Sequence, residues 1–97
     1  KVIDVVNELE SHGIDVQLHD PLVDEREALA HHGVNLTERG ALAAADAVIL
    51  AVAHDEFVRS GWSIMKELLV DGSGIVFDVR GVLDRAQIPE QITLLRL

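Results

Sequence analysis

Helical and strand-like hydrophobic patterns alternate along the first part of the chain. A first helix is predicted by apolar residues at positions i, i+3, i+4 and i+7, namely Val2, Val5, Val6 and Leu9. Gly13 supplies the left-handed conformation that commonly ends such a helix. Residues 14–18 (Ile-Asp-Val-Gln-Leu) then alternate apolar and polar side chains, which predicts a strand with one less buried face.

Turn and capping residues organise the next segment. The elements expected here are a turn over residues 20–24, a helix over 25–32, a short edge strand over 34–36 and a weak helix over 38–46. Pro21 fixes its own backbone dihedral and ends the preceding strand. Asp24 and Glu27 resemble a capping box and predict where the helix begins, and Gly33 predicts where it ends.

Continuous apolar runs dominate the rest of the chain. Residues 47–52 and 75–77 have the composition of central strands in a covered parallel sheet. An amphipathic helix over 62–70 separates them, and Trp62 at its start is expected to pack in a core or an interface. Residues 92–97 are predicted to form a last strand. Strands separated by helices pair in parallel, so we predict an α/β, Rossmann-like, doubly wound and mainly parallel sheet with helices on both faces.

The strand pattern also predicts that one strand is missing. Residues 14–18 have the pattern of a peripheral strand, whereas 47–52 have that of a central one. In the order of a dinucleotide-binding fold, a first strand would lie between these two. The chain instead opens inside a helical pattern. We therefore expect residues 1–97 to be a single domain from a longer chain, with its first strand upstream.

Composition and charge narrow the class of protein. A chain of 97 residues is long enough for one domain. A net charge of −9 with scattered basic residues argues against a nucleic-acid partner. The absence of cysteine excludes a disulfide framework, a thiolate metal site and a cysteine nucleophile within these residues. No apolar run reaches the length of a membrane span, so we expect a cytoplasmic protein without a membrane partner.

The segment "GIVFDVRGVLDR", residues 74–85, carries the strongest candidate chemistry. Arg80 follows the carboxyl end of a predicted strand, where open α/β sheets bind ligands. Its guanidinium is a planar fork of donors suited to phosphate or sugar oxygens. The alternative is a salt bridge to Asp78 or Asp84 within the domain. Arg85 is interpreted as a solvated loop charge.

Two further residues are candidates for substrate binding. Asp78 is suited to orienting Arg80 or to capping the turn that follows it. His54 follows the predicted strand 47–52 at the same edge of the sheet, where a histidine is able to act as an acid or a base. No nucleophile stands beside His54, and its loop is equally suited to facing a partner domain. No catalytic residue is assigned.

The remaining histidines and Asp20 do not predict a metal or a dinucleotide site. His31 and His32 are neighbours on a helix and point in different directions. His12 and His19 lack partners at metal-ligand spacing, so no metal site is expected. Asp20 stands where a Rossmann domain places an acidic residue for a ribose hydroxyl, but the G-x-G-x-x-G turn is absent. Asp20 is therefore interpreted as a turn residue.

Four segments together resemble the C-terminal domain of the UDP-glucose/GDP-mannose dehydrogenase family. They are "HDPLVD", "ADAVILAVAHDEF", "FDVRGVLDR" and "LLRL", and their order and spacing match over essentially the whole chain. The "AHDEF" and "DVRGVLDR" variants look most like members that oxidise UDP-N-acetylhexosamines for surface polysaccharides.

The resemblance implies a role for the chain and for Arg80. Enzymes of this family oxidise the C6 hydroxyl of a nucleotide sugar to a carboxylate in two NAD-dependent steps, through a cysteine thioester. Their N-terminal domain binds NAD, a central helical domain dimerises, and the C-terminal domain closes over the nucleotide. Arg80 stands at the arginine of the family's FDxR motif, which contacts substrate. Residues 1–97 alone are therefore expected to bind no NAD and to be inactive.

Two alternatives remain open at this point. The first is a dinucleotide-binding module of another dehydrogenase, which an upstream G-x-G-x-x-G would support, whereas an upstream Phe-Lys pair followed by Asp-x-Arg would support the resemblance. The second is a non-enzymatic interaction domain with a receiver-like α/β fold. A receiver needs a cluster of acidic residues, and Asp78 is the one suitably placed acidic residue.

Overall fold

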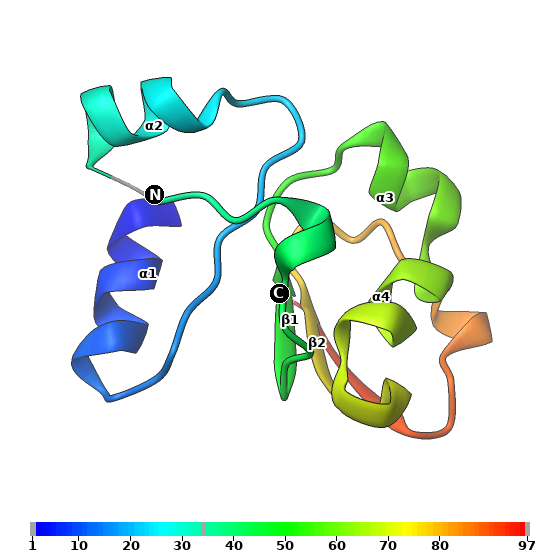
Figure 1. The fold of residues 1–97 in the computed structure, drawn as a ribbon. Helices are drawn as coiled ribbons and strands as arrows, with labels where there is room; N and C mark the ends of the chain where they lie inside the picture. The colour runs from blue at the N-terminus through cyan, green and yellow to red at the C-terminus, as the bar shows by residue number, and fades with distance from the viewer. Residues whose placement is uncertain (1, 34, 97) are drawn as a thin grey trace. The chain divides into compact units, whose positions relative to one another are not determined.

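The structure is a computed structural model that describes residues 2–33 and 35–96. The chain divides into two compact units, Lys1–Leu42 and Ala43–Leu97. Figure 1 colours the chain from blue at its beginning to red at its end. No helix within the described residues is long and apolar enough to cross a membrane.

The first unit consists of short helices joined by extended segments (Figure 1). The helices are α1 (Val2–Ser11), α2 (Glu25–His32) and the 3₁₀ turn η1 (Arg39–Ala41). Asp24 caps α2, because its carboxylate accepts from the backbone N–H groups of Arg26 and Glu27. Gly33 ends α2 in the left-handed conformation, with φ of 65°. The predicted start and end of this helix are confirmed.

The strands predicted over 14–18 and 34–36 are wrong for the described residues. Residues 14–18, Asn35 and Leu36 belong to no ladder, and Val34 lies outside the described residues. Thr37 N–H donates to the Leu18 carbonyl oxygen at 2.7 Å. A strand requires a continued ladder with a partner, so alternation alone was insufficient. The upstream first strand stays a prediction.

The helix predicted over 38–46 is also wrong in extent. A single 3₁₀ turn, η1, forms in its place. The segment is made largely of small residues and contains Gly40. Such residues bury little apolar surface, and a short helix depends on packing for its stability. The cost of ordering glycine adds to this.

The second unit contains the parallel sheet. Its strands are β1 (Ala47–Leu50), β2 (Gly74–Asp78) and β3 (Ile92–Arg96), in the order β1-β2-β3. Leu50 pairs with Asp78, and Asp78 pairs with Arg96. The predicted α/β, Rossmann-like parallel arrangement is confirmed. β1 lies at an edge of the described sheet, although its apolar run resembles a central strand.

Helices α3 (Asp55–Ser60) and α4 (Trp62–Leu68) lie between β1 and β2 in sequence and beside the sheet in space (Figure 1). The 3₁₀ turns η2 (Val70–Gly72) and η3 (Arg85–Gln87) complete the unit. The buried core comprises Leu50, Phe57, Ile64, Met65, Leu69, Val76, Leu83 and Ile92. These side chains join one face of the sheet to α3 and α4. The opposite positions Ile49, Ile75 and Leu95 remain exposed.

Gly74 lies where the start of β2 comes very close to the backbone of Asp46. Its φ is 143°, and a Cβ at this position would stand 2.4 Å from the Asp46 carbonyl oxygen. A larger residue would therefore collide with backbone. The glycine allows β2 to enter the sheet in the register that brings its end, Asp78, beside the end of β3.

Candidate functional site

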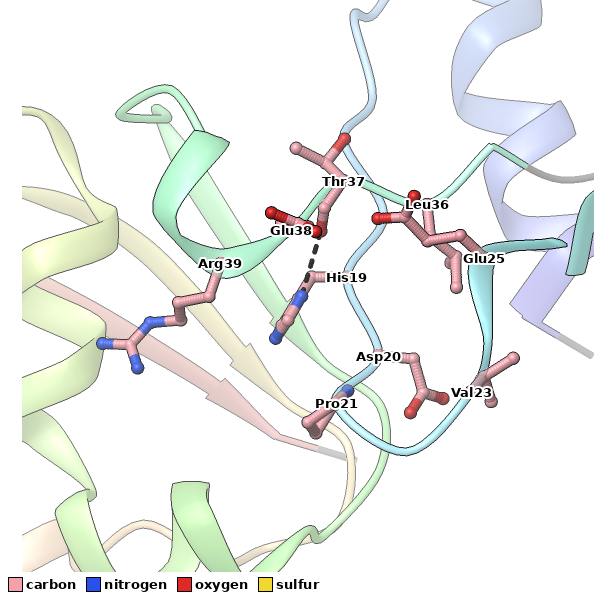
Figure 2. A pocket seen from close by; sticks show the side chains of 9 residues that line it. All are labelled: His19, Asp20, Pro21, Val23, Glu25, Leu36, Thr37, Glu38 and Arg39. Atoms are coloured by element: carbon pink, nitrogen blue, oxygen red, sulfur yellow. Dashed lines mark hydrogen bonds between the residues drawn. The ribbon is translucent and has the colours of Figure 1, made fainter.

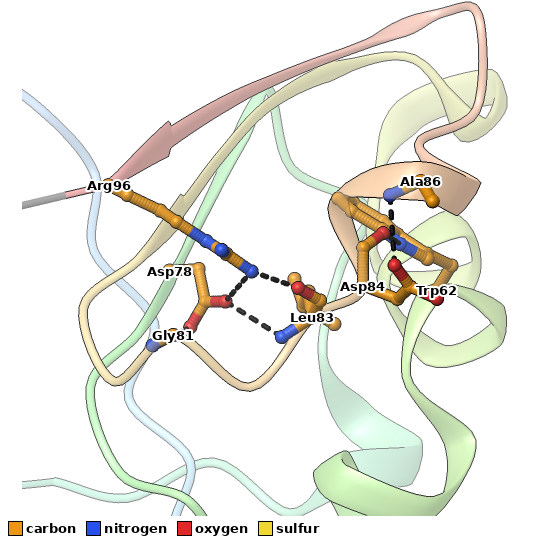
Figure 3. Close-up of polar contacts among 7 residues, drawn as sticks. All are labelled: Trp62, Asp78, Gly81, Leu83, Asp84, Ala86 and Arg96. Atoms are coloured by element: carbon orange, nitrogen blue, oxygen red, sulfur yellow. Dashed lines mark hydrogen bonds and ion pairs between the residues drawn. The ribbon is translucent and has the colours of Figure 1, made fainter.

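The site lies at the carboxyl edge of the sheet in the second unit. Because β1, β2 and β3 are parallel, their last residues Leu50, Asp78 and Arg96 lie at the same edge. Open α/β sheets bind ligands at this edge. Figure 3 shows the polar contacts that form there.

Asp78 closes the turn that follows β2. Its side chain is buried, with the residue 1% exposed. Oδ1 accepts from the Gly81 N–H at 2.9 Å, and Oδ2 accepts from the Leu83 N–H at 2.8 Å (Figure 3). Gly81 has φ of 69°, a left-handed conformation that favours glycine. The capping interpretation of Asp78 is confirmed.

Arg96 provides the counter-ion for this buried carboxylate. Its Nη2 lies 3.3 Å from Asp78 Oδ2 and also donates to the Leu83 carbonyl oxygen. The Asp78 side chain is 0% exposed and that of Arg96 is 22% exposed. A buried carboxylate without a partner would be strongly destabilising. Arg96 therefore ties the end of β3 both to the end of β2 and to the far side of the turn.

Sequence reasoning missed Arg96, although a signal was present. Arg96 occupies the same alternating face of β3 as Ile92 and Leu94, which are turned toward the core. A charged residue at the inward phase of an otherwise apolar strand requires a partner. Asp78 at the inward phase of β2 is the matching carboxylate, but their pairing depends on the register.

Arg80 lies on this turn between Asp78 and the first N–H group that Asp78 holds, that of Gly81, and it is exposed. Among the described residues it forms no ion pair with Asp78 or Asp84. Asp78 pairs with Arg96, and the Asp84 carboxylate accepts from the Ala86 N–H at 2.9 Å. The salt-bridge alternative for Arg80 is therefore wrong for the described residues, and its guanidinium is open to a ligand.

Backbone and core contacts fix both ends of the turn. Val79 N–H donates to the Leu50 carbonyl at 3.1 Å, which continues the β1–β2 ladder past β2. Leu83 is 3% exposed and belongs to the core. Trp62 packs against that core, as predicted, and its Nε1–H donates to the Asp84 carbonyl at 2.9 Å (Figure 3). The segment carrying Arg80 is thus held before and after the arginine.

His54 lies at the same edge, after β1, and begins α3 as its N-cap residue. Its ring is partly buried, and its centroid is 6.0 Å from that of Phe57 with an interplanar angle of 53°. Because β1 and β2 are neighbours, His54 and Arg80 follow adjacent strand ends. The histidine packs against its own helix, and a role in substrate binding stays a prediction.

A cavity lies within the first unit, at the end of segment 14–18 (Figure 2). This open cavity of about 280 Å³ is lined by His19, Asp20, Pro21, Val23, Glu25, Leu36, Thr37, Glu38 and Arg39. His19 Nδ1 donates to the Thr37 carbonyl oxygen at 3.0 Å. Asp20 accepts from the Leu22 N–H at 2.9 Å, which confirms it as a turn residue. Three carboxylates beside one arginine make the lining unfavourable for a phosphate.

The histidines outside these two regions occupy ordinary positions. His12 Nε2 lies 3.4 Å from Glu8 Oε1 on exposed α1, and His31 is exposed. The side chain of His32 lies outside the described part of the structure. Within residues 2–33 and 35–96, no three His, Asp or Glu side chains are grouped to hold a metal ion.

Comparison with known proteins gives consistent matches. Residues 1–85 match the model of the UDP-glucose/GDP-mannose dehydrogenase family, UDP binding domain. The chain is 31% identical to Protein CapL of Staphylococcus aureus over 97 residues, which is 100% of this chain and 22% of that protein. It is 33% identical to a UDP-N-acetyl-D-glucosamine 6-dehydrogenase of Pseudomonas aeruginosa over 84 residues, covering 87% of this chain and 20% of that enzyme.

A third relative is a UDP-N-acetyl-D-glucosamine 6-dehydrogenase of Salmonella typhi. It is 30% identical over 87 residues, covering 90% of this chain and 20% of that enzyme. The chain therefore spans about a fifth of the length of these relatives. No solved structure matches the chain significantly.

Proposed function

Because this chain belongs to the UDP-glucose/GDP-mannose dehydrogenase family as a UDP binding domain, we propose that it holds the nucleotide end of a UDP-sugar for an NAD-dependent 6-dehydrogenase. The family predicted from the four sequence segments is thereby confirmed. The two relatives named as UDP-N-acetyl-D-glucosamine 6-dehydrogenases favour a UDP-N-acetylhexosamine as the substrate.

The position of Arg80 is the single observation that carries this proposal. Its side chain is exposed at the carboxyl edge of the sheet, and its turn is anchored on both sides. The N–H groups of Gly81 and Leu83 already donate to Asp78 and are not available to a phosphate. The guanidinium of Arg80 is suited to the diphosphate, since it pairs with phosphate oxygens through charge-assisted hydrogen bonds.

The overall charge of the chain makes this local arrangement necessary. At −9, the chain as a whole does not attract an anionic nucleotide. A single arginine held in place is able to bind a diphosphate despite that charge, because the interaction acts over a few ångströms and is screened farther away. Asp78, neutralised by Arg96, opposes the approach of phosphate less than a free carboxylate would.

In the proposed reaction, binding of the nucleotide orients the sugar at its distant C6 carbon. The C6 alcohol is oxidised through the aldehyde to the carboxylate; water supplies the second oxygen, and two NAD⁺ accept two hydrides while three protons are released. The N-terminal domain of the longer protein would bind NAD, and the catalytic cysteine would come from outside residues 1–97. The role of this chain is to contribute binding energy from the non-reacting part of the substrate.

The remaining parts of the proposal concern the cellular setting. We expect a cytoplasmic homodimer whose product, a nucleotide-linked uronic acid, is used to make surface polysaccharide. Asp78 acts by shaping the turn. His54 is a second candidate for contact with the nucleotide, because it follows the strand end beside that of Asp78.

NADH formation by the natural full-length protein tests the proposal. The sugars offered in turn are UDP-N-acetylglucosamine, UDP-N-acetylgalactosamine, UDP-N-acetylmannosamine, UDP-glucose and GDP-mannose. About two NADH per molecule of a UDP-N-acetylhexosamine are expected, because the conversion of an alcohol to a carboxylate removes four electrons. No NADH from any of the five would contradict the proposed function.

A further inference from the structure

We propose that Arg96 is a positioning residue for UDP-sugar binding, which acts by fixing the turn that presents Arg80. The inference rests on the proposed function, since it takes Arg80 as the group that meets the diphosphate. Arg96 lies outside residues 1–85, the part of the chain that the family model matches. Its role is inferred here from the contacts of β3 alone.

One nitrogen of Arg96 joins two parts of the turn. Nη2 contacts Asp78 Oδ2 at 3.3 Å and donates to the Leu83 carbonyl oxygen (Figure 3). Asp78 begins the turn and Leu83 ends it, so the guanidinium spans the loop from one side to the other. Arg80 lies between these two anchors. Its backbone position is therefore set by a closed ring of contacts: Asp78 to Leu83, Leu83 to Arg96, and Arg96 to Asp78.

The geometry of these contacts requires an arginine. The two hydrogens of Nη2 lie in the plane of the guanidinium and point in fixed directions, one for each oxygen. A lysine ammonium is a point charge on a flexible stem and does not fix two directions in one plane. The Nε of Arg96 is buried and has no hydrogen-bond partner among the described residues. The pairing with the turn therefore depends on the outer nitrogen.

The pair is also a costly way to stabilise a strand end. Two apolar residues of similar volume at buried positions are often as stabilising as an ion pair, or more so. Asp78 and Arg96 are register partners at the ends of β2 and β3, at the ligand-binding edge and next to an exposed arginine. A role in holding the turn explains this placement, whereas a need for stability alone does not.

A double-mutant cycle on the natural full-length protein tests the inference. The affinity for UDP is measured by calorimetry for wild type, Arg96→Lys, Arg80→Ala and the double variant. Arg96→Lys is expected to weaken UDP binding by about 5-fold, within the usual range for coupled neighbours. In the Arg80→Ala background the same change is expected to have no effect, because the group that it positions is gone.

Arg59→Lys is the matched control. Arg59 is exposed in the last turn of α3. Its replacement by lysine makes the same exchange of guanidinium for ammonium, away from the turn that follows β2. Its UDP affinity should equal that of wild type. A KM for the UDP-sugar that rises in Arg96→Lys while kcat stays constant would further separate positioning from damage to the enzyme.

Three results would overturn the inference. Arg96→Lys binding UDP as tightly as wild type is the first, and a 5-fold loss that persists in the Arg80→Ala background is the second. The third is independent of variants: in wild type, the amides of Gly81 and Leu83 must be protected from hydrogen exchange before UDP is added. Exchange of these amides at unprotected rates would show that the turn is not held, even if Arg96→Lys failed to fold.

The failure of this inference is distinguishable from failure of the proposed function. If Arg80→Ala leaves UDP affinity unchanged, the proposed site is wrong. If Arg80→Ala weakens binding but Arg96→Lys does not, Arg80 keeps its role and only the positioning by Arg96 is wrong.

Discussion

Two aspartate-led turns follow extended segments in this chain, and their surroundings differ. Asp20 accepts from the N–H of Leu22, and that leucine is 79% exposed. Asp78 is buried, accepts from two N–H groups of its turn and pairs with Arg96. The same residue type therefore forms a local turn in one place and a fixed support in the other. Asp78 is distinguished by its full burial and by its ion pair with an arginine of the neighbouring strand.

Only the second turn is suited to holding a ligand-binding side chain. A substrate contact must be kept in place by supporting contacts if it is to select a transition state. The turn after β2 has such supports from Leu50, Asp78, Arg96 and Trp62. The turn at Asp20 faces an open cavity with several carboxylates. The turn after β2 is therefore the better supported of the two, and Arg80 on it stays the candidate for substrate contact.

The largest difference in stability is expected between the two aspartate-to-asparagine substitutions. In Asp78→Asn, one carbonyl oxygen replaces two acceptors, so the amide NH₂ faces either the Gly81 or the Leu83 N–H, and Arg96 loses its counter-ion. We expect a loss of about 3–5 kcal/mol in the free energy of unfolding, because one partner of a buried pair is removed. Asp20→Asn should cost less, since Asp20 is only partly buried and asparagine forms the same turn.

Urea denaturation of the natural full-length protein measures both substitutions of this pair. The first unfolding transition should move clearly in Asp78→Asn and little in Asp20→Asn. Equal shifts for the two variants would contradict the distinction between a buried and a local turn.

A smaller loss of stability is expected from substituting either of two glycines that have similar positive φ angles. Gly81 and Gly13 have φ of 69° and 79°, and a Cβ at either position would meet nothing within 4 Å. An alanine therefore adds only backbone strain, about 1–2 kcal/mol at each site. Gly81→Ala should also weaken UDP binding by displacing Arg80, whereas Gly13→Ala should not. Thermal unfolding and UDP calorimetry together check this; a similar loss of affinity in both variants would contradict it.

The smallest expected effect concerns the support from α4. Trp62→Phe keeps an aromatic ring at the edge of the core. It removes the indole N–H that donates to the Asp84 carbonyl, together with part of the ring surface. About 1 kcal/mol of stability should be lost, the usual value for a neutral hydrogen bond. Urea denaturation of Trp62→Phe and Asp78→Asn side by side ranks the two supports by the free energy of unfolding that each contributes. A loss in Trp62→Phe equal to that in Asp78→Asn would show that the ion pair is not the main anchor.

The elements that could be predicted from the sequence are those that a short run of neighbouring residues is enough to define. The apolar runs at 47–52 and 75–77 predicted β1 and β2, although β1 ends at Leu50. Asp24 and Gly33 predicted the ends of α2. The alternation over 14–18 was misleading, because a strand also needs a partner that no local pattern supplies.

The site was predicted in part for the same reason. Arg80 and Asp78 became candidates because they follow a recognisable strand. Arg96 was missed, since its pairing with Asp78 depends on the β2–β3 register, which brings together residues 18 positions apart. The supposed salt bridge of Arg80 to Asp78 was wrong because Arg96 occupies that carboxylate from the neighbouring strand.

The affinity for UDP of Arg80→Ala beside Arg85→Ala, in the natural full-length protein, tests the central claim most directly. Both arginines are exposed and lie five positions apart, but Arg85 belongs to η3, beyond the anchored turn. Arg80→Ala should weaken UDP binding by roughly 10- to 100-fold, as expected for the loss of a charge-assisted hydrogen bond, and Arg85→Ala should leave it nearly unchanged. Equal affinities for wild type and Arg80→Ala would contradict the account.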